Sequence, residues 1–164
     1  MKQYPKLLES KVKIRFQDCD PFNHLNNAAY LNYLINARED QVLEQYGLDI
    51  YNMAKTNGIS WVTASNQISY IRPAFLMEEV VINSQLLLVK DSSIKVELKM
   101  WNKDKTEIKA VMWSTFVHFN LLKQKTEKHS EELIKLFKSV VNPIDTNVFE
   151  ERILSIKKQT VVLN

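Results

Sequence analysis

The side chains best suited to chemistry lie close together in one short stretch, residues 15–30. This stretch holds two carboxylates, one histidine, one thiol and three asparagines: Asp18, Asp20, His24, Cys19, Asn23, Asn26 and Asn27. A carboxylate can act as a general base or as a nucleophile. The start of a helix has unpaired N–H groups and a partial positive charge, which can hold the oxygen of a carbonyl group under attack. Asp20 precedes Asn27 by seven residues, across a turn forced by Pro21, so the spacing permits both to face one carbonyl group.

Most of these residues also have a purely structural interpretation. Asp20 precedes a proline and can simply form a turn, and Asp18 can brace the loop as a hydrogen-bond acceptor. Asn26 and Asn27 are interpreted first as helix N-caps. Cys19 is a poor nucleophile, because the acids on either side of it disfavour its thiolate.

His24 can either pack against this loop or contact a substrate, and the sequence leaves both roles open. The other two histidines, His118 and His129, are far away in the sequence. One histidine with two nearby carboxylates is a possible metal site, but no other histidine lies near it in the sequence, and thioester hydrolysis requires no metal. We therefore expect no metal and no cofactor.

Composition limits the class of protein. A chain of 164 residues is one domain by default, and its formal net charge of +3 is too small to predict a nucleic-acid partner. A single cysteine excludes an intrachain disulfide framework and suggests a cytoplasmic location. No apolar run is long enough to span a membrane. The only glycines, Gly47 and Gly58, cannot make a Rossmann or P-loop motif.

The elements that must position the loop follow from hydrophobic periodicity. Val12, Ile14 and Phe16 alternate with basic residues, which predicts a half-buried strand before the loop. A long helix is expected after the loop, from about residue 28 to 46, with Gly47 ending it. Four further strands are expected at 59–71, 80–89, 94–100 and 108–121, the second of them buried on both faces or central. A helix should begin after Ser130, and weak apolar spacing in 142–164 suggests another short helix. This order predicts an α+β fold, a mostly antiparallel sheet with one buried helix.

That order, together with Asp18-Cys19-Asp20-Pro21 and Asn26-Asn27-Ala28-Ala29-Tyr30, resembles the hot-dog-fold acyl-CoA thioesterases, specifically the 4-hydroxybenzoyl-CoA thioesterase group. Ile71-Arg72-Pro73-Ala74 resembles the proline break after that family's second strand. The similarity covers roughly residues 10–122. It implies a curled antiparallel five-stranded sheet wrapped around one long central helix, with a C-terminal helix. We accordingly divide the chain into a hot-dog domain, residues 1–140, and a C-terminal extension of unassigned role, residues 141–164.

The resemblance also implies roles for individual residues. Asp20 matches the catalytic carboxylate, which activates water or attacks the thioester carbonyl directly. The backbone N–H of Asn27 matches the donor that polarises this carbonyl, and His24 is expected to help place the substrate. The other substrate contacts expected are Asn26, Tyr30 and Pro73. The family's pocket lies at a dimer interface, so a homodimer or homotetramer is expected.

The function expected is hydrolysis of an acyl-CoA or acyl-carrier thioester to a carboxylic acid and a thiol. One alternative is a hot-dog hydratase or dehydratase, in which a histidine and an acid act together. Another is a non-catalytic acyl-CoA-binding module. Retention of Asp20 in an Asp-x-Asp pattern favours hydrolysis over both.

Overall fold

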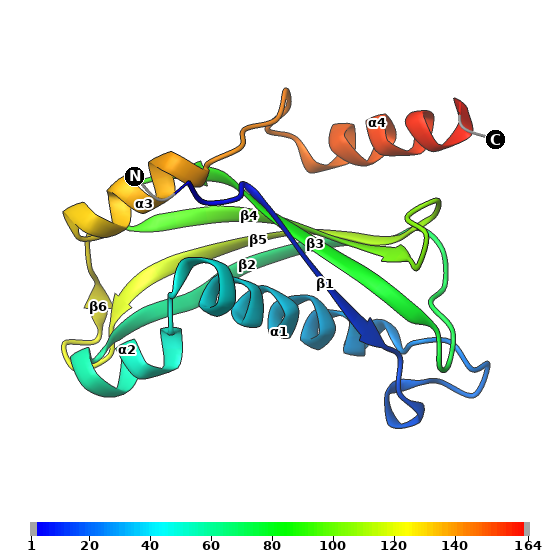
Figure 1. Cartoon of the computed structure of the whole chain (residues 1–164), viewed down its shortest axis with the longest axis horizontal. Coiled ribbons are helices and arrows are strands. Elements are labelled where there is room, and N and C mark those ends of the chain that lie inside the picture. Colours follow the sequence, from blue (N-terminus) through cyan, green and yellow to red (C-terminus); the bar gives the residue numbers. More distant parts are fainter. Residues whose placement is uncertain (1–2, 163–164) are drawn as a thin grey trace.

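The computed structural model describes residues 3–162. Its centre is an antiparallel sheet with the strand order β1-β3-β4-β5-β2, to which a two-residue strand, β6, is added beside β5 (Figure 1). The strands are β1 (Leu7–Lys13), β2 (Ile59–Tyr70), β3 (Glu79–Val89), β4 (Ser93–Asn102), β5 (Ile108–Asn120) and β6 (Lys125–Thr126). The four long strands predicted after the helix are confirmed, and β3 is almost wholly buried, as its apolar sequence predicts.

The long helix α1 (Asn27–Tyr46) lies against one face of this sheet (Figure 1). Asn26 is its N-cap, because the Asn26 side-chain oxygen accepts a hydrogen bond from the Ala28 N–H. Gly47 ends the helix in the left-handed conformation, at φ 68°, where glycine lacks the Cβ that would clash. Tyr30, Leu34 and other apolar side chains pack α1 into the main core between helix and sheet.

Three more helices surround this unit: α2 (Ile50–Asn57), α3 (Glu131–Val140) and α4 (Phe149–Val162). Ser130 caps α3 as predicted, accepting a hydrogen bond from the Leu133 N–H. Helix α4 lies on the opposite face of the sheet from α1 (Figure 1). There it forms a second hydrophobic cluster made of Phe149, Ile153 and Ile156 from α4 with Leu87, Ile108, Val111 and Trp113 from the sheet. The extension therefore covers the outer face of the sheet.

The first strand was predicted too late in the chain. β1 ends at Lys13, which pairs with Glu79 at the start of β3, so the ladder has no partner beyond that point. Phe16, predicted as a strand residue, begins the short 3-10 helix η1 (Phe16–Asp18) and is 78% exposed. The alternation of apolar and basic residues at 11–16 thus continues beyond Lys13, where β3 no longer offers a partner, and for that reason it predicted a strand that is too long at this end.

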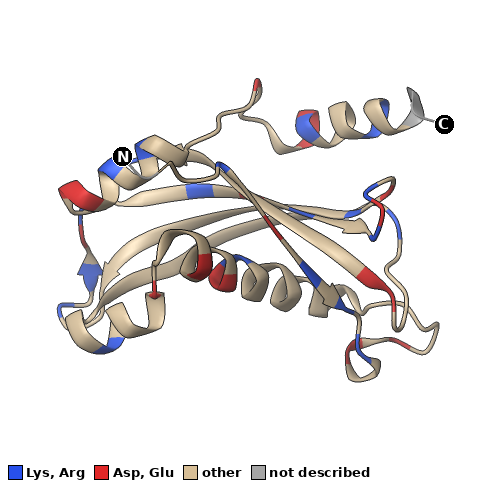
Figure 2. Ribbon diagram, in the orientation of Figure 1, with Lys and Arg blue, Asp and Glu red and all other residues tan. Residues whose placement is uncertain are grey.

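Charged side chains are mixed rather than segregated. Figure 2 shows acidic and basic residues next to one another at the start of α4 and in the turn between β4 and β5. Among residues 3–162, no helix is both long and apolar enough to cross a membrane.

Candidate active site

The loop between β1 and α1 is held in place by the chain segment that precedes β3. Ile14 donates its N–H to the Glu78 carbonyl at 2.9 Å, and Met77 donates to the Ile14 carbonyl at 3.0 Å. Further along, the Leu25 N–H donates to the Ala74 carbonyl at 2.8 Å. The loop is therefore pinned at both ends to residues 74–78, which follow the Pro73 break.

Asp20 uses one carboxylate oxygen to shape its own turn. Its Oδ1 accepts hydrogen bonds from the N–H groups of Phe22, at 2.9 Å, and His24, at 3.1 Å. The Asp20 N–H donates in turn to the His24 carbonyl at 2.8 Å. Within the described chain, no hydrogen bond reaches the other oxygen, Oδ2. This carboxylate is thus both oriented by the loop and left with an oxygen able to act on a substrate.

The start of α1 supplies the second part of the site. The Asn26 side chain caps the Ala28 N–H at 3.0 Å, while the Asn27 N–H forms no hydrogen bond with any residue of 3–162. The carbonyl of Asn27 accepts a bond from the Tyr70 hydroxyl at 2.9 Å. Asn27 is consequently fixed from β2, with its own N–H available at the positive end of a 20-residue helix.

One cavity brings the acid and the helix start together. It encloses about 500 Å³ of empty space, part of it open to solvent. Its lining residues are Asp20, His24, Leu25, Asn27, Tyr30, Tyr70, Ile71, Arg72 and Pro73. Five of the six site residues selected from the sequence line it, and the sixth, Asn26, caps the helix instead of lining the cavity.

Two aromatic contacts define the walls of this cavity. The His24 ring packs edge-on against Phe75, with centroids 5.1 Å apart. Tyr30 packs edge-on against Tyr70, also at 5.1 Å, and its hydroxyl accepts a hydrogen bond from the Ala74 N–H. Burial raises the pKa of the Tyr30 phenol, so this hydroxyl is neutral at physiological pH.

Asp18 performs a different task from Asp20. The Tyr33 hydroxyl donates to Asp18 Oδ2 at 2.6 Å and accepts from the Arg15 N–H at 3.1 Å. Asp18 thereby ties the loop to the first half of α1. Between the two acids, burial and the negative charges of Asp18 and Asp20 raise the pKa of the Cys19 thiol, which keeps it protonated and unreactive.

The sequence did not single out Arg72 or Tyr70 as site residues. Arg72 stands in the Ile71-Arg72-Pro73-Ala74 motif, and the motif was the available signal for it. Tyr70 reaches the site only because β2 runs beside the start of α1, which spacing in the sequence cannot reveal. The two remaining histidines lie elsewhere: the rings of His118 and His129 are tilted against each other, with centroids 4.8 Å apart, beside Trp61.

Comparison with known proteins identifies the family. The family model described as the thioesterase-like superfamily matches residues 14–137. The chain belongs to the thioesterase-like superfamily. The predictions of a hot-dog fold and of a thioester hydrolase are thereby confirmed.

Relatives of this thioesterase-like chain agree in fold. It is 28% identical over 134 residues to the long-chain acyl-CoA thioesterase FadM of Escherichia coli strain K12, covering 82% of this chain and 99% of FadM. The crystal structure of YbaW, a probable thioesterase from Escherichia coli, is similar with a TM-score of 0.69 and 27% identity, covering 82% of this chain and 99% of YbaW. The Synechocystis 1,4-dihydroxy-2-naphthoyl-CoA thioesterase Slr0204 gives a TM-score of 0.74 at 12% identity, covering 84% of this chain and 99% of Slr0204. Helix α4 lies beyond the region that the family model matches.

Proposed function

We propose that this chain hydrolyses acyl-CoA thioesters, with the cavity between Asp20 and the start of α1 as its active site. Water adds to the carbonyl carbon, the carbon–sulfur bond breaks, and the products are a carboxylic acid and the free thiol. The observation that supports this most strongly is that Asp20 and Asn27 line one cavity. The name of FadM, a long-chain acyl-CoA thioesterase, supports coenzyme A as the carrier.

Asp20 is the general base or the nucleophile in this proposal. Its Oδ1 is occupied by the N–H groups of Phe22 and His24, so Oδ2 is the oxygen that would take a proton from water or attack the carbonyl carbon. The two hydrogen bonds fix the carboxylate, and a fixed base loses little entropy on reaching the transition state.

The Asn27 N–H is the oxyanion donor in this proposal. As the carbonyl carbon becomes tetrahedral, its oxygen gains negative charge and is stabilised by the N–H group and the partial positive charge at the helix start.

His24 and Tyr30 would hold the thioester against Pro73, since all three line the cavity. Arg72 is placed to meet a negative group at the cavity mouth, because its side chain is about half exposed.

We also propose that the protein forms a homodimer or homotetramer in which copies pair two by two through the free edge of β2. Residues 62–67 of this strand are exposed, and β2 pairs only with β5 among the described strands. An open edge of this length favours pairing with another strand. Size-exclusion chromatography with light scattering would measure the oligomeric state, and a monomer at micromolar concentration would refute the proposal.

The reaction is tested by thiol release from a panel of short, long and aromatic acyl-CoAs. We expect release from at least one substrate; no release from any would refute the activity. Formation of an enoyl-CoA from 3-hydroxyacyl-CoA would instead support the hydratase alternative, in which His24, the one histidine of residues 3–162 that lines this cavity, would act together with an acid.

The oxyanion role is tested by Asn27→Pro. Proline is tolerated at the first position of a helix, and the preceding Asn26 already has the extended conformation (ψ 134°) that proline requires. The variant therefore removes the N–H, together with the Asn27 side chain, without breaking the helix, and turnover should fall about 100- to 1000-fold. Asn27→Ala keeps the N–H and serves as the matched control, with turnover within a few-fold of the wild type. Equal activity of the two variants would refute the assignment.

A further inference from the structure

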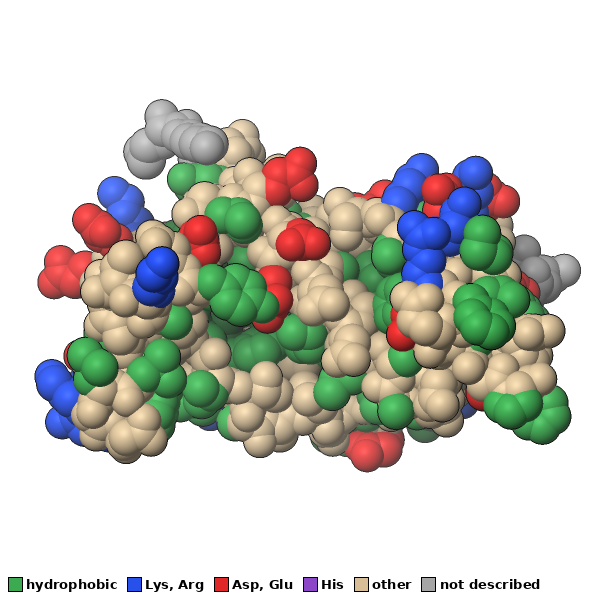
Figure 3. Space-filling view, turned by 90° about the horizontal axis from the view of Figure 1, so that it is seen from below, with side chains coloured by type: hydrophobic (Ala, Val, Ile, Leu, Met, Phe, Trp, Pro, Cys, Tyr) green, Lys and Arg blue, Asp and Glu red, His purple; other side chains and the backbone are tan. Residues whose placement is uncertain are grey.

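A second cavity lies beside the C-terminal half of α1. It encloses about 650 Å³ of empty space, part of it open to solvent, which is within the usual range for small-molecule sites. Ten of its thirteen lining residues are hydrophobic, the exceptions being Arg38, Glu39 and Thr63. Figure 3 shows hydrophobic side chains at the bottom of a hollow on this face of the molecule, with acidic side chains near its edge.

Arg38 is the unexpected feature of this cavity. Its side chain is 7% exposed, and its Nη1 donates one hydrogen bond, to the Ser84 hydroxyl at 3.0 Å. The guanidinium also lies against Tyr46, with Cζ 6.0 Å from the ring centroid. Among residues 3–162, no carboxylate is within ion-pair distance of Arg38. A guanidinium has five N–H donors; Ser84 and Tyr46 engage part of the Arg38 group, which leaves further N–H groups for a ligand.

The charge on Arg38 persists despite its burial. Burial lowers its pKa to about 10, while the neighbouring Tyr46 acts in the opposite direction. Arg38 is therefore a cation at neutral pH. A buried cation with no counter-ion is energetically costly, and a carboxylate bound beside it would offset that cost.

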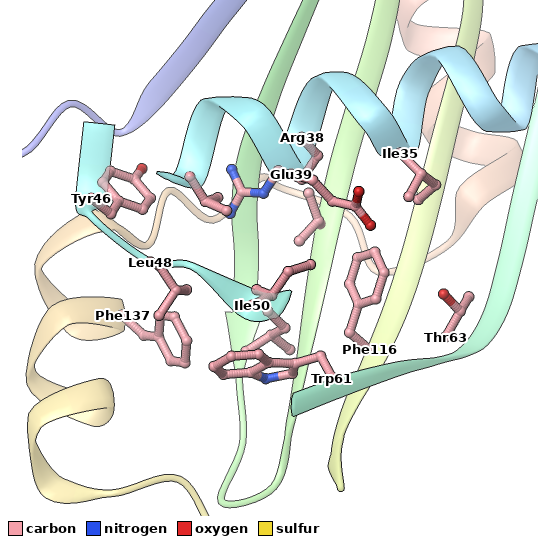
Figure 4. A pocket seen from close by; sticks show the side chains of 13 residues that line it. Ile35, Arg38, Glu39, Tyr46, Leu48, Ile50, Trp61, Thr63, Phe116 and Phe137 are labelled. Carbon is pink, nitrogen blue, oxygen red and sulfur yellow. The ribbon is translucent and has the colours of Figure 1, made fainter. Parts of the chain in front are cut away.

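Glu39 does not neutralise Arg38. Figure 4 shows the Arg38 guanidinium on the Tyr46 side of the cavity and the Glu39 carboxylate on the Phe116 side. The Glu39 carboxylate accepts a hydrogen bond from the Tyr51 hydroxyl at 2.5 Å. The positive and negative groups thus occupy different parts of the cavity wall.

One stripe of residues on α1 extends from the proposed active site to this cavity. Asn27, Leu31, Ile35 and Arg38 follow one another at intervals of four, four and three residues, which places them on one face of the helix. Leu31 and Ile35 are half-buried, and Ile68 of β2 packs into the same core. The stripe is apolar between its two polar ends.

The length of this stripe determines how long a bound acyl chain must be to reach from one end of it to the other. Asn27 and Arg38 are eleven residues apart, which is ~16 Å along the helix axis at about 1.5 Å per residue. An extended hydrocarbon chain advances roughly 1.25 Å per carbon, given C–C bonds of about 1.5 Å in staggered geometry. A chain of about 13 carbons therefore spans from the carbonyl site to the guanidinium.

We propose that this cavity receives the distal end of the acyl chain, and that Arg38 selects chains carrying a second carboxylate at that end. The favoured substrate class is then a coenzyme A monothioester of a long-chain dicarboxylic acid. This inference rests on the proposed function, because it assigns the substrate of the same active site. The carboxylate accepts from the free N–H groups of Arg38, and the methylenes lie along Leu31, Ile35 and Phe116.

The test compares hydrolysis of the monothioester of tetradecanedioic acid with that of tetradecanoyl-CoA. For the wild type we expect kcat/KM to be at least tenfold higher for the dicarboxylic substrate. Arg38→Met should remove this preference and keep hydrolysis of tetradecanoyl-CoA. Glu39→Gln is the matched control on the same cavity wall and should retain the preference. The octanedioic monothioester is too short to reach Arg38 and should show no effect of Arg38→Met.

A binding measurement separates this inference from the proposed function. Trp61 lines the cavity, so tetradecanedioate should change tryptophan fluorescence, with at least tenfold weaker binding to Arg38→Met. If Arg38→Met fails to fold by circular dichroism, Arg38→Lys replaces it, with a reduced preference expected. Hydrolysis without any preference for the dicarboxylic chain, or a preference that survives Arg38→Met, would overturn the inference alone. Hydrolysis of neither substrate by a protein that hydrolyses another acyl-CoA of the panel would also overturn the inference alone. No hydrolysis of any acyl-CoA in the panel would overturn the proposed function, and the fluorescence measurement would then decide the inference.

Discussion

Replacing Arg152 with methionine should lower the free energy of unfolding by about 2–3 kcal/mol. Arg152 on α4 makes two short hydrogen bonds to Glu97 on β4, from Nε at 2.8 Å and from Nη2 at 2.7 Å. Glu97 is 1% exposed, so the substitution leaves a buried carboxylate without its bidentate partner. Breaking such a pair typically costs about 3–5 kcal/mol. Lys99, at 3.2 Å, and the Trp113 N–H, at 2.9 Å, remain on Glu97 and should reduce this loss.

The pKa of Glu97 reflects the combined effect of all its partners. Burial raises this pKa, but the hydrogen bond from Arg152, the charge of Lys99 and the Trp113 N–H more than offset burial and bring the pKa from 4.5 to about 2. At about 1.4 kcal/mol per pKa unit, the net interaction is about 3 kcal/mol. Because the folded pKa lies below the unfolded value, this stability is present above pH 4.5 and is lost as the pH falls toward 2.

Urea unfolding at pH 7 and at steps down to pH 3 measures both effects. Arg152→Met should be less stable at pH 7 and should lose less stability than the wild type on acidification. Arg72→Met is the matched control, since the Arg72–Glu107 pair is 3.7 Å apart and exposed; we expect a change below about 0.5 kcal/mol. A similarly small change for Arg152→Met, with no coupling to Glu97→Gln in a double-mutant cycle, would show that this pair does not hold α4 to the sheet.

Two further predictions concern the loop and a helix end. Tyr33→Phe removes the hydroxyl that joins Asp18 to the Arg15 N–H; we expect a loss of about 1–2 kcal/mol in urea unfolding and slower thiol release, and unchanged values of both would exclude the bracing role. Gly58→Ala should destabilise more than Gly47→Ala, although both glycines have a left-handed φ: an added Cβ would lie 2.7 Å from Leu122 Cγ at Gly58, whereas nothing lies within 4 Å at Gly47. Thermal melting compares the two variants, and equal melting temperatures would mean that Leu122 moves aside without cost.

Periodicity predicted the long elements because each has one face in the main core. The helix at 27–46 and the strands at 59–70, 79–89, 93–102 and 108–120 all show the repeat that their burial requires. Helix α2 was missed because it is only eight residues long, although Asp49 caps its start and Gly58 its end. Those two caps were the signals that could have revealed it.

Long-range contacts explain what the sequence could not predict. Gln41 is buried on α1 because its side-chain N–H groups meet Ser10 and the Ile82 carbonyl, from two different strands. Arg38 is likewise buried, with its guanidinium bonded to Ser84 of β3 and lying against Tyr46. Local patterning places such polar residues on a solvated face, and only the folded sheet supplies their partners. The residues of the loop motif at 18–30, by contrast, are close together in the sequence, and for that reason the sequence predicted most of the residues that line the cavity.

The most direct test of the account is the turnover of Asp20→Asn. Asparagine keeps a side-chain oxygen able to accept from the Phe22 and His24 N–H groups, so the loop should stay folded while the charge is lost. We predict a fall in kcat of about 100-fold or more with an unchanged melting temperature, whereas Asp18→Asn, which also keeps an acceptor for Tyr33, should remain within a few-fold of the wild type. Full activity of Asp20→Asn on a substrate that the wild type hydrolyses would contradict the claim that this carboxylate and the α1 N-terminus act on one thioester carbonyl.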